Sequence, residues 1–119
     1  MTISKLVSVS AVTKLNFSPE SQNDLLDIKK YITEELDSPI AAENTLKKIL
    51  KNIRMLESQP FIGAPLSSII NIDTHYRFLV CGNYLAFYYV ENEEIFIVRI
   101  LYGRRDYVKI LFGELPNTH

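Results

Sequence analysis

The stretch of residues 75–112 constrains the fold most, because three apolar runs follow one another there with almost no chain between them. The first run ends at Gly82-Asn83, a pair that tolerates the positive φ angles of a two-residue hairpin turn. The second ends at the charged segment Glu91-Asn92-Glu93, which suits another turn. All three are rich in β-branched and aromatic residues and predict an antiparallel meander. Their ranges are Tyr76–Cys81, Tyr84–Val90 and Ile95–Tyr102.

Two predicted helices precede the meander. Ser18-Pro19-Glu20 has the features of a helix start, with serine as the N-cap, proline at the first helical position and an acid in the first turn. Ser38-Pro39 repeats this signal. Helices joined by so short a link form an αα-hairpin, whose apolar side we expect to cover the meander. The residues at helical spacing are Leu25, Ile28, Ile32 and Leu36 in the first helix and Ala42, Leu46, Ile49, Ile53 and Leu56 in the second.

The remaining segments complete an α+β prediction. We expect a first strand at Thr13–Phe17, a long loop at 60–74, and a short helix that Asp106 caps and that ends at Phe112. The predicted order is β-α-α-β-β-β plus this C-terminal helix, in one domain of residues 1–119 whose ends, 1–12 and 113–119, are peripheral or frayed. The helices are expected to cover one sheet face and to leave the other partly open.

Size and charge restrict the possible functions. The chain has 119 residues, of which 47% are apolar, and this suits one globular core. Its 13 basic and 14 acidic residues give a net charge of -1, so any nucleic-acid function must depend on a local basic patch. The single cysteine, Cys81, suits a reducing compartment. No run approaches the ~20 apolar residues of a membrane span and no signal peptide is recognisable, so we expect a cytoplasmic protein.

Known metal and phosphate motifs are missing from the sequence. There is no HExxH, paired CxxC, GxGxxG or GxxxxGK[ST], and the only histidines are His75 and His119. We therefore predict no metal and no cofactor. Arginine, lysine, tyrosine and a single central histidine remain as candidates for chemistry.

Two arginines inside the meander, Arg77 and Arg99, are the first site candidates, because an arginine in an apolar strand needs a partner or an open face. On an open sheet face they would bind a phosphate and stabilise the charge that grows on it. The alternative is an ion pair with a glutamate of the second turn, or cation–π packing on a strand tyrosine.

Further candidates follow the last strand. Arg104 and Arg105 form either a basic edge or a solvated helix start. Tyr107 offers a phenol as a general acid or for stacking on a base, although a tyrosine in this position more often packs. Lys109 and Arg105 are the candidates for nucleic-acid contact. His75 has an unperturbed pKa near neutrality and either shuttles protons or is simply exposed.

The chain resembles the RelE/ParE superfamily, the toxins of bacterial type II toxin–antitoxin systems. The resemblance extends from Leu15 to Phe112, and it lies in an ordered set of motifs rather than in any single one. The motifs are F-S-P-E-S-x-x-D-L-x-x-I-x-x-Y-I (Phe17–Ile32), P-x-x-G (Pro60–Gly63), Y-R (Tyr76-Arg77), G-N-Y-L-x-F-Y (Gly82–Tyr88) and R-I-L-Y-G-R-R-D-Y (Arg99–Tyr107). The family implies a helical hairpin packed on an antiparallel sheet and a cognate antitoxin as partner.

The resemblance leaves the target open. RelE-like members cut ribosome-bound messenger RNA without a metal, and by motif match Arg77, Arg99, Arg104 and Tyr107 would form such a site. ParE-like members poison DNA gyrase and are not known as hydrolases. From sequence we favour messenger cleavage, with gyrase poisoning and a decayed, non-toxic member that only binds its antitoxin as alternatives.

Overall fold

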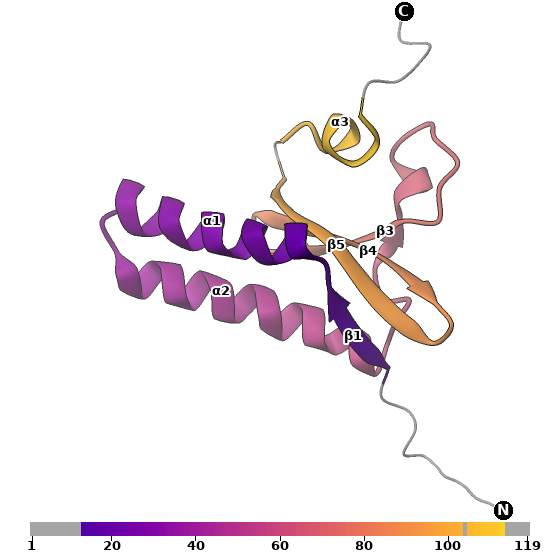
Figure 1. Ribbon diagram of the computed structural model, residues 1–119, viewed down its shortest axis with the longest axis horizontal. Coiled ribbons are helices and arrows are strands. Elements are labelled where there is room, and N and C mark those ends of the chain that lie inside the picture. Colours follow the sequence, from indigo (N-terminus) through magenta and orange to yellow (C-terminus); the bar gives the residue numbers. More distant parts are fainter. Residues whose placement is uncertain (1–12, 104, 114–119) are drawn as a thin grey trace, which may run out of the picture.

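The computed structural model describes residues 13–103 and 105–113, which form one sheet with helices on both of its faces (Figure 1). The predicted α+β class and the order of strands and helices are confirmed. The predictions for residues 1–12 and 114–119 lie outside the described residues.

Five strands form the sheet in the spatial order β1-β5-β4-β3-β2. β3, β4 and β5 are the predicted meander and pair antiparallel. β1 lies parallel to β5, with Lys14 opposite Glu94. β2, a short strand within the predicted long loop, adds an antiparallel pairing at the other edge. The strands span Lys14–Phe17 (β1), Ala64–Pro65 (β2), Arg77–Cys81 (β3), Tyr84–Glu91 (β4) and Glu94–Tyr102 (β5).

The helices α1 (Pro19–Glu35) and α2 (Pro39–Arg54) cover one face of the sheet as a hairpin (Figure 1). Ser18 and Ser38 cap them as predicted, since each side chain accepts a hydrogen bond from a first-turn N–H, at 3.0 and 3.1 Å. A short 3-10 helix, η2 (Met55–Glu57), follows α2. Among the described residues, no helix has the length and apolar character to cross a membrane. The main core contains Ile28, Ile32, Ala42, Ile49, Ile53, Leu56, Cys81, Ala86, Tyr88, Ile95, Ile97 and Ile100.

The other face of the sheet is covered too, and the expectation of an open face is wrong. α3 (Tyr107–Phe112) and the segment around the 3-10 helix η3 (Leu66–Ser68) pack there on a second core. Its fully buried members are Leu66, Phe87 and Leu101. The apolar residues of the terminal helix and of the long loop need a surface on which to be buried, and this face provides it.

Both connections of the meander are two-residue hairpin turns. Gly82 has a φ of 65°, which agrees with the prediction. In the second turn only Asn92 and Glu93 turn the chain, with φ angles of 52° and 62°, while Glu91 pairs with Glu94. This turn is therefore shorter than the predicted three-residue segment, because two successive positive φ angles match the twist of the flanking strands.

Beyond the end of β1, the start of α1 becomes the neighbour of β5. Ser18 donates its backbone N–H to the Ile97 carbonyl at 2.9 Å and its hydroxyl to the Val98 carbonyl at 2.8 Å. Further along β5, the backbone N–H of Ile100 donates to Oδ2 of Asp24 at 2.8 Å. The hydrogen bonding of the sheet edge is thus continued by groups of α1.

Asp24 also forms a bidentate ion pair with Arg99. Nε and Nη2 of Arg99 donate to Oδ2 and Oδ1 of Asp24, both at 2.8 Å. Asp24 is only 7% exposed. Its hydrogen bonds raise the pKa of Arg99, so the guanidinium remains charged. The pair, together with the bond from Ile100, fastens α1 to β5.

Replacing Asp24 with alanine should lower the free energy of unfolding by about 3 kcal/mol, because the Ile100 N–H and the Arg99 guanidinium both lose their acceptor. Urea unfolding followed by circular dichroism measures the change. The control is Asp27→Ala, because Asp27 lies on the exposed side of the same helix. This change should alter the free energy of unfolding by less than about 0.5 kcal/mol. Equal stabilities of the two variants would show that Asp24 does not hold the helix in place.

Candidate functional site

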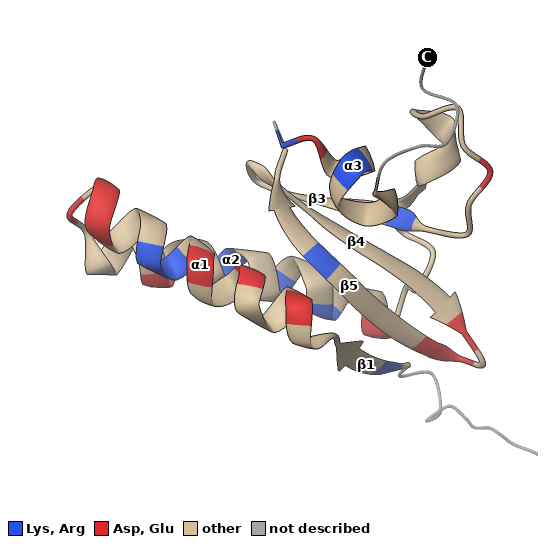
Figure 2. Ribbon diagram, turned by 45° about the horizontal axis from the view of Figure 1, so that its top comes forward, with Lys and Arg blue, Asp and Glu red and all other residues tan. Residues whose placement is uncertain are grey.

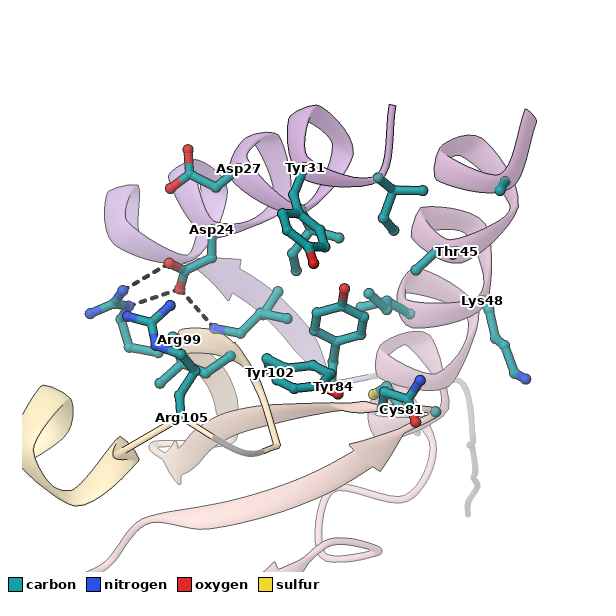
Figure 3. Close-up of a pocket in the computed structure, with 18 of the residues that line it drawn as sticks. Asp24, Asp27, Tyr31, Thr45, Lys48, Cys81, Tyr84, Arg99, Tyr102 and Arg105 are labelled. Atoms are coloured by element: carbon teal, nitrogen blue, oxygen red, sulfur yellow. Dashed lines mark hydrogen bonds and ion pairs between the residues drawn. The ribbon is translucent and has the colours of Figure 1, made fainter. Parts of the chain in front are cut away.

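A groove of about 860 Å³ lies between the helical hairpin and the end of the sheet that carries the Gly82-Asn83 turn (Figure 3). α1 and α2 form one side, and the ends of β3, β4 and β5 form the other. Segments far apart in the sequence therefore meet in it. Its lining includes Asp24, Tyr31, Leu36, Thr45, Lys48, Cys81, Tyr84, Arg99, Tyr102 and Arg105.

Apolar groups are exposed along this groove. Tyr31 is 60% exposed and Leu36 is 62% exposed, although the helical spacing predicts Leu36 as a core residue. The cause is visible in Figure 1, where the hairpin extends beyond the sheet and leaves the last turn of α1 with no strand beneath it. An open groove with an apolar lining is a typical binding surface.

Three tyrosines from different elements surround the groove: Tyr31 from α1, Tyr84 from β4 and Tyr102 from β5 (Figure 3). The rings of Tyr84 and Tyr102 meet edge to face, with centroids 5.8 Å apart. Burial raises the pKa of Tyr84, and the neighbouring phenols of Tyr102 and Tyr31 raise it further. The Tyr84 hydroxyl therefore stays protonated at neutral pH and can donate a hydrogen bond to a bound segment.

Charged side chains lie toward the two ends of the groove. Asp24, Arg99 and Arg105 are at one end, and Lys48 is at the other (Figure 3). Of the predicted site residues, the structure brings Arg99 and Arg105 together here. The arrangement suits a segment with apolar side chains in its middle and polar groups at both ends.

Arg77 lies at the other edge of the sheet. Its Nη2 donates to the backbone carbonyls of Phe61 and Gly63 at 3.1 and 2.6 Å, and its guanidinium carbon lies 5.2 Å from the centre of the Phe61 ring. Arg99 instead reaches α1, next to β1. The two guanidinium groups are thus directed to opposite edges of the sheet, and the structure does not bring them together.

The remaining candidates lie on the α3 side of the sheet. The ring of Tyr107 packs against Phe87, with centroids 5.3 Å apart, and Tyr107 belongs to the second core. His75 stacks on Tyr76 with centroids 5.0 Å apart. Lys109 is exposed on α3. Arg104 lies outside the described residues.

Sequence reasoning missed Asp24 and the three groove tyrosines. A signal for Asp24 exists, because it precedes Ile28 by four positions and therefore lies on the buried face of α1. A carboxylate there needs a partner. The tyrosines come from three separate elements, and only the packing of the hairpin on the sheet brings them together.

Comparison with known proteins identifies the family of this chain. The family model described as "ParE toxin of type II toxin-antitoxin system, parDE" matches residues 15–107. The chain belongs to the ParE toxin family. This confirms the resemblance to the RelE/ParE superfamily that the ordered motifs indicate.

The ParE fold is seen in a solved relative as well. A chain of the structure titled "Chromosomal ParDE TA system from P. aeruginosa" is similar to this one with a TM-score of 0.66 and 23% identity. The match covers 78% of this ParE-family chain and 98% of that chain. No curated protein matches the chain. At this identity the structural likeness establishes the fold.

The thiol of Cys81, at the base of the groove, should be unreactive in the folded protein. Burial raises its pKa from 9.0 to about 11. Between these values the unfolded chain has lost the thiol proton while the folded chain keeps it, so this group lowers stability as the pH rises from 9 to about 11. Near pH 9, iodoacetamide should label Cys81 slowly in buffer and rapidly in urea. Equally fast labelling in both solvents would contradict the buried, protonated thiol.

Proposed function

We propose that this ParE-family toxin arrests growth by binding and inhibiting DNA gyrase, without hydrolysing nucleic acid, and that a cognate antitoxin neutralises it. The family match over residues 15–107 carries the proposal. Gyrase poisoning is the activity of ParE-like members of the superfamily, whereas messenger cleavage belongs to RelE-like members. The proposal therefore reverses the preference for messenger cleavage that the sequence motifs suggest.

Two features of the chain support binding over cleavage. Arg77 and Arg99, the phosphate ligands of the nuclease hypothesis, both have partners within the protein and are directed to opposite edges of the sheet. There is also no lysine between Glu57 and His75, where RelE-like enzymes carry basic residues, and the net charge is -1. A slightly acidic protein is poorly suited to ribosome-bound messenger RNA. Under this proposal neither these arginines nor Arg104 and Tyr107 take part in proton transfer or phosphate chemistry.

The groove is the proposed site for the antitoxin. The solved relative is a ParDE toxin–antitoxin system. An amphipathic helix laid into the groove would bury Tyr31 and Leu36, which are otherwise exposed to water. The phenol of Tyr84 would donate to a polar group of that helix. Lys48 and Arg105, both exposed, offer cations for its acidic side chains at the two ends.

Expression of the chain alone in a bacterium should arrest growth and stop DNA synthesis before protein synthesis. The reason is that gyrase inhibition blocks replication directly. Pulse labelling with thymidine and with methionine immediately after induction measures both rates. Induction of the DNA-damage response should accompany the loss of thymidine incorporation.

An early stop of protein synthesis, with cut ends on translated messages, would instead establish messenger cleavage. Tyr107→Phe sharpens the distinction, because it keeps the ring that packs on Phe87 and removes only the phenolic hydroxyl group. A gyrase-binding toxin should keep its full toxicity in this variant. Normal growth with abundant soluble wild-type protein would indicate a decayed member.

Charges placed in the groove should weaken neutralisation by the antitoxin while toxicity remains. Leu36→Glu and Tyr31→Glu should each weaken antitoxin binding about tenfold or more, because a buried, unpaired carboxylate opposes docking of an apolar helix. The matched control is Leu26→Glu, since Leu26 is 64% exposed on the same helix but does not line the groove. Calorimetry with the purified antitoxin measures the affinities. Equal losses in Leu26→Glu and Leu36→Glu would remove the groove as the antitoxin site.

A further inference from the structure

The loop Pro60–Gly63 is held rigidly by a buried phenol. The Tyr88 hydroxyl donates to the Pro60 carbonyl at 2.9 Å and accepts from the Gly63 N–H at 3.0 Å, and Tyr88 is fully buried. Gly63 fits so closely that a Cβ there would lie 2.6 Å from both the Tyr88 hydroxyl and the Phe78 carbonyl oxygen. Only glycine permits this approach.

Arg77, the cross-strand neighbour of Tyr88, fastens the same loop. Its two hydrogen bonds go to the Phe61 and Gly63 carbonyls, so four hydrogen bonds from two side chains fix this loop. Both donors of the Arg77 contacts come from one guanidinium nitrogen, Nη2. Arg77 is thus a positioning residue for a short loop that carries no charged group of its own.

The side chains that this anchored loop presents to solvent are apolar. Phe61 is 63% exposed and Ile62 is 42% exposed. The buried Tyr88 and the half-buried Arg77 therefore hold two hydrophobic side chains outside the core. A hydrophobic side chain on a rigid loop loses little conformational freedom on binding, which is the property of an interface anchor.

The charge around the anchored loop is positive. Lys51 and Arg54 are exposed in the last turn of α2, which η2 separates from the loop, and Arg77 lies against Phe61. Among residues 51–63 only Glu57 opposes these three cations. α1 carries five acidic and two basic residues, whereas α2 carries one acidic and four basic residues, so the two helices of the hairpin differ in net charge (Figure 2). A partner with an apolar pocket and an acidic rim complements this surface.

The anchored loop is separate from the groove. The groove is lined by α2 residues no further along than Ile49 and by β3 only at Cys81, whereas Arg77 begins that strand. The length of β3 alone separates the two surfaces by about 13 Å. A helix bound in the groove therefore leaves Phe61 and Ile62 uncovered.

We propose that the anchored loop is the surface with which the toxin binds its target, inserting Phe61 into an apolar pocket with an acidic rim on the gyrase protein. This rests on the proposed function, which supplies the target. It also assigns a role to Arg77, which acts through the loop and not on a phosphate. The target and the antitoxin then bind different surfaces of the toxin.

Supercoiling by purified gyrase at increasing toxin concentrations tests the proposal. Phe61→Ala and Arg54→Glu should each raise the half-inhibitory concentration about tenfold or more, and the affinity for the antitoxin should stay unchanged. The matched control is Ile69→Ala, because Ile69 is 50% exposed, next to η3. That variant should inhibit like the wild type. Since Phe61 is exposed, its truncation should leave thermal melting unchanged.

The role of Arg77 has its own test. Arg77→Ala should weaken inhibition, but adding Phe61→Ala to it should have little further effect, because both changes act on one contact. If the losses of inhibition from the two changes add up in the double variant, Arg77 acts beyond the loop, and its positioning role is overturned. Wild-type inhibition by Phe61→Ala would overturn the assignment of the loop to the target. A loss of antitoxin binding by Phe61→Ala with unchanged inhibition of gyrase would overturn this assignment as well.

A wild-type toxin that does not inhibit gyrase would overturn the proposed function and leave a separate test of the loop. Growth arrest by Phe61→Ala and Ile69→Ala then decides. Loss of arrest in Phe61→Ala alone supports the loop as the target surface, and arrest by both variants rejects it.

Discussion

The carboxylate of Asp24 determines where the helical hairpin sits on the sheet. β1 ends at Phe17, and beyond it the edge of β5 needs other hydrogen-bond partners. Asp24 accepts from the backbone of Ile100 and at the same time neutralises Arg99. The groove is bounded by the helices on one side and by the strand ends on the other. Its width therefore depends on the contacts by which Asp24 holds α1 against β5. Losing the carboxylate would change the binding surface as well as the stability.

The parts of the fold that the sequence predicts are those with local signals. The Ser-Pro starts at residues 18 and 38, the helical spacing that follows them, and the turn at Gly82-Asn83 all act within a few positions. The parallel pairing of β1 with β5 joins Lys14 to Glu94, and no pattern in either segment encodes that contact. The packing of α3 on the second face of the sheet was also unpredictable. The apolar side of α3 shows only that the helix packs somewhere, not on which face of the sheet.

The site was harder to predict than the fold. An arginine inside an apolar strand indicates that a partner exists but not which one. The sequence suggests glutamates of the second turn for Arg99, whereas its partner Asp24 lies 75 positions earlier in the chain. The partners of Arg77 are backbone carbonyls, which leave no trace in the sequence. Identifying the family narrows the biological role. The partners that Arg77 and Arg99 have within the protein favour a structural role for these two arginines over a catalytic one.

The parallel neighbour of β1 has a consequence for synthesis of the protein. A ribosome releases the N-terminal strand first, but Asn16 and Ser18 bond to Glu94 and Val98, 78 and 80 positions later. Until β5 emerges, β1 has no strand to pair with, and Asp24 of α1 lacks its partners Arg99 and Ile100. A nascent chain thus cannot assemble the groove or the sheet edge beside it before β5 has been synthesised.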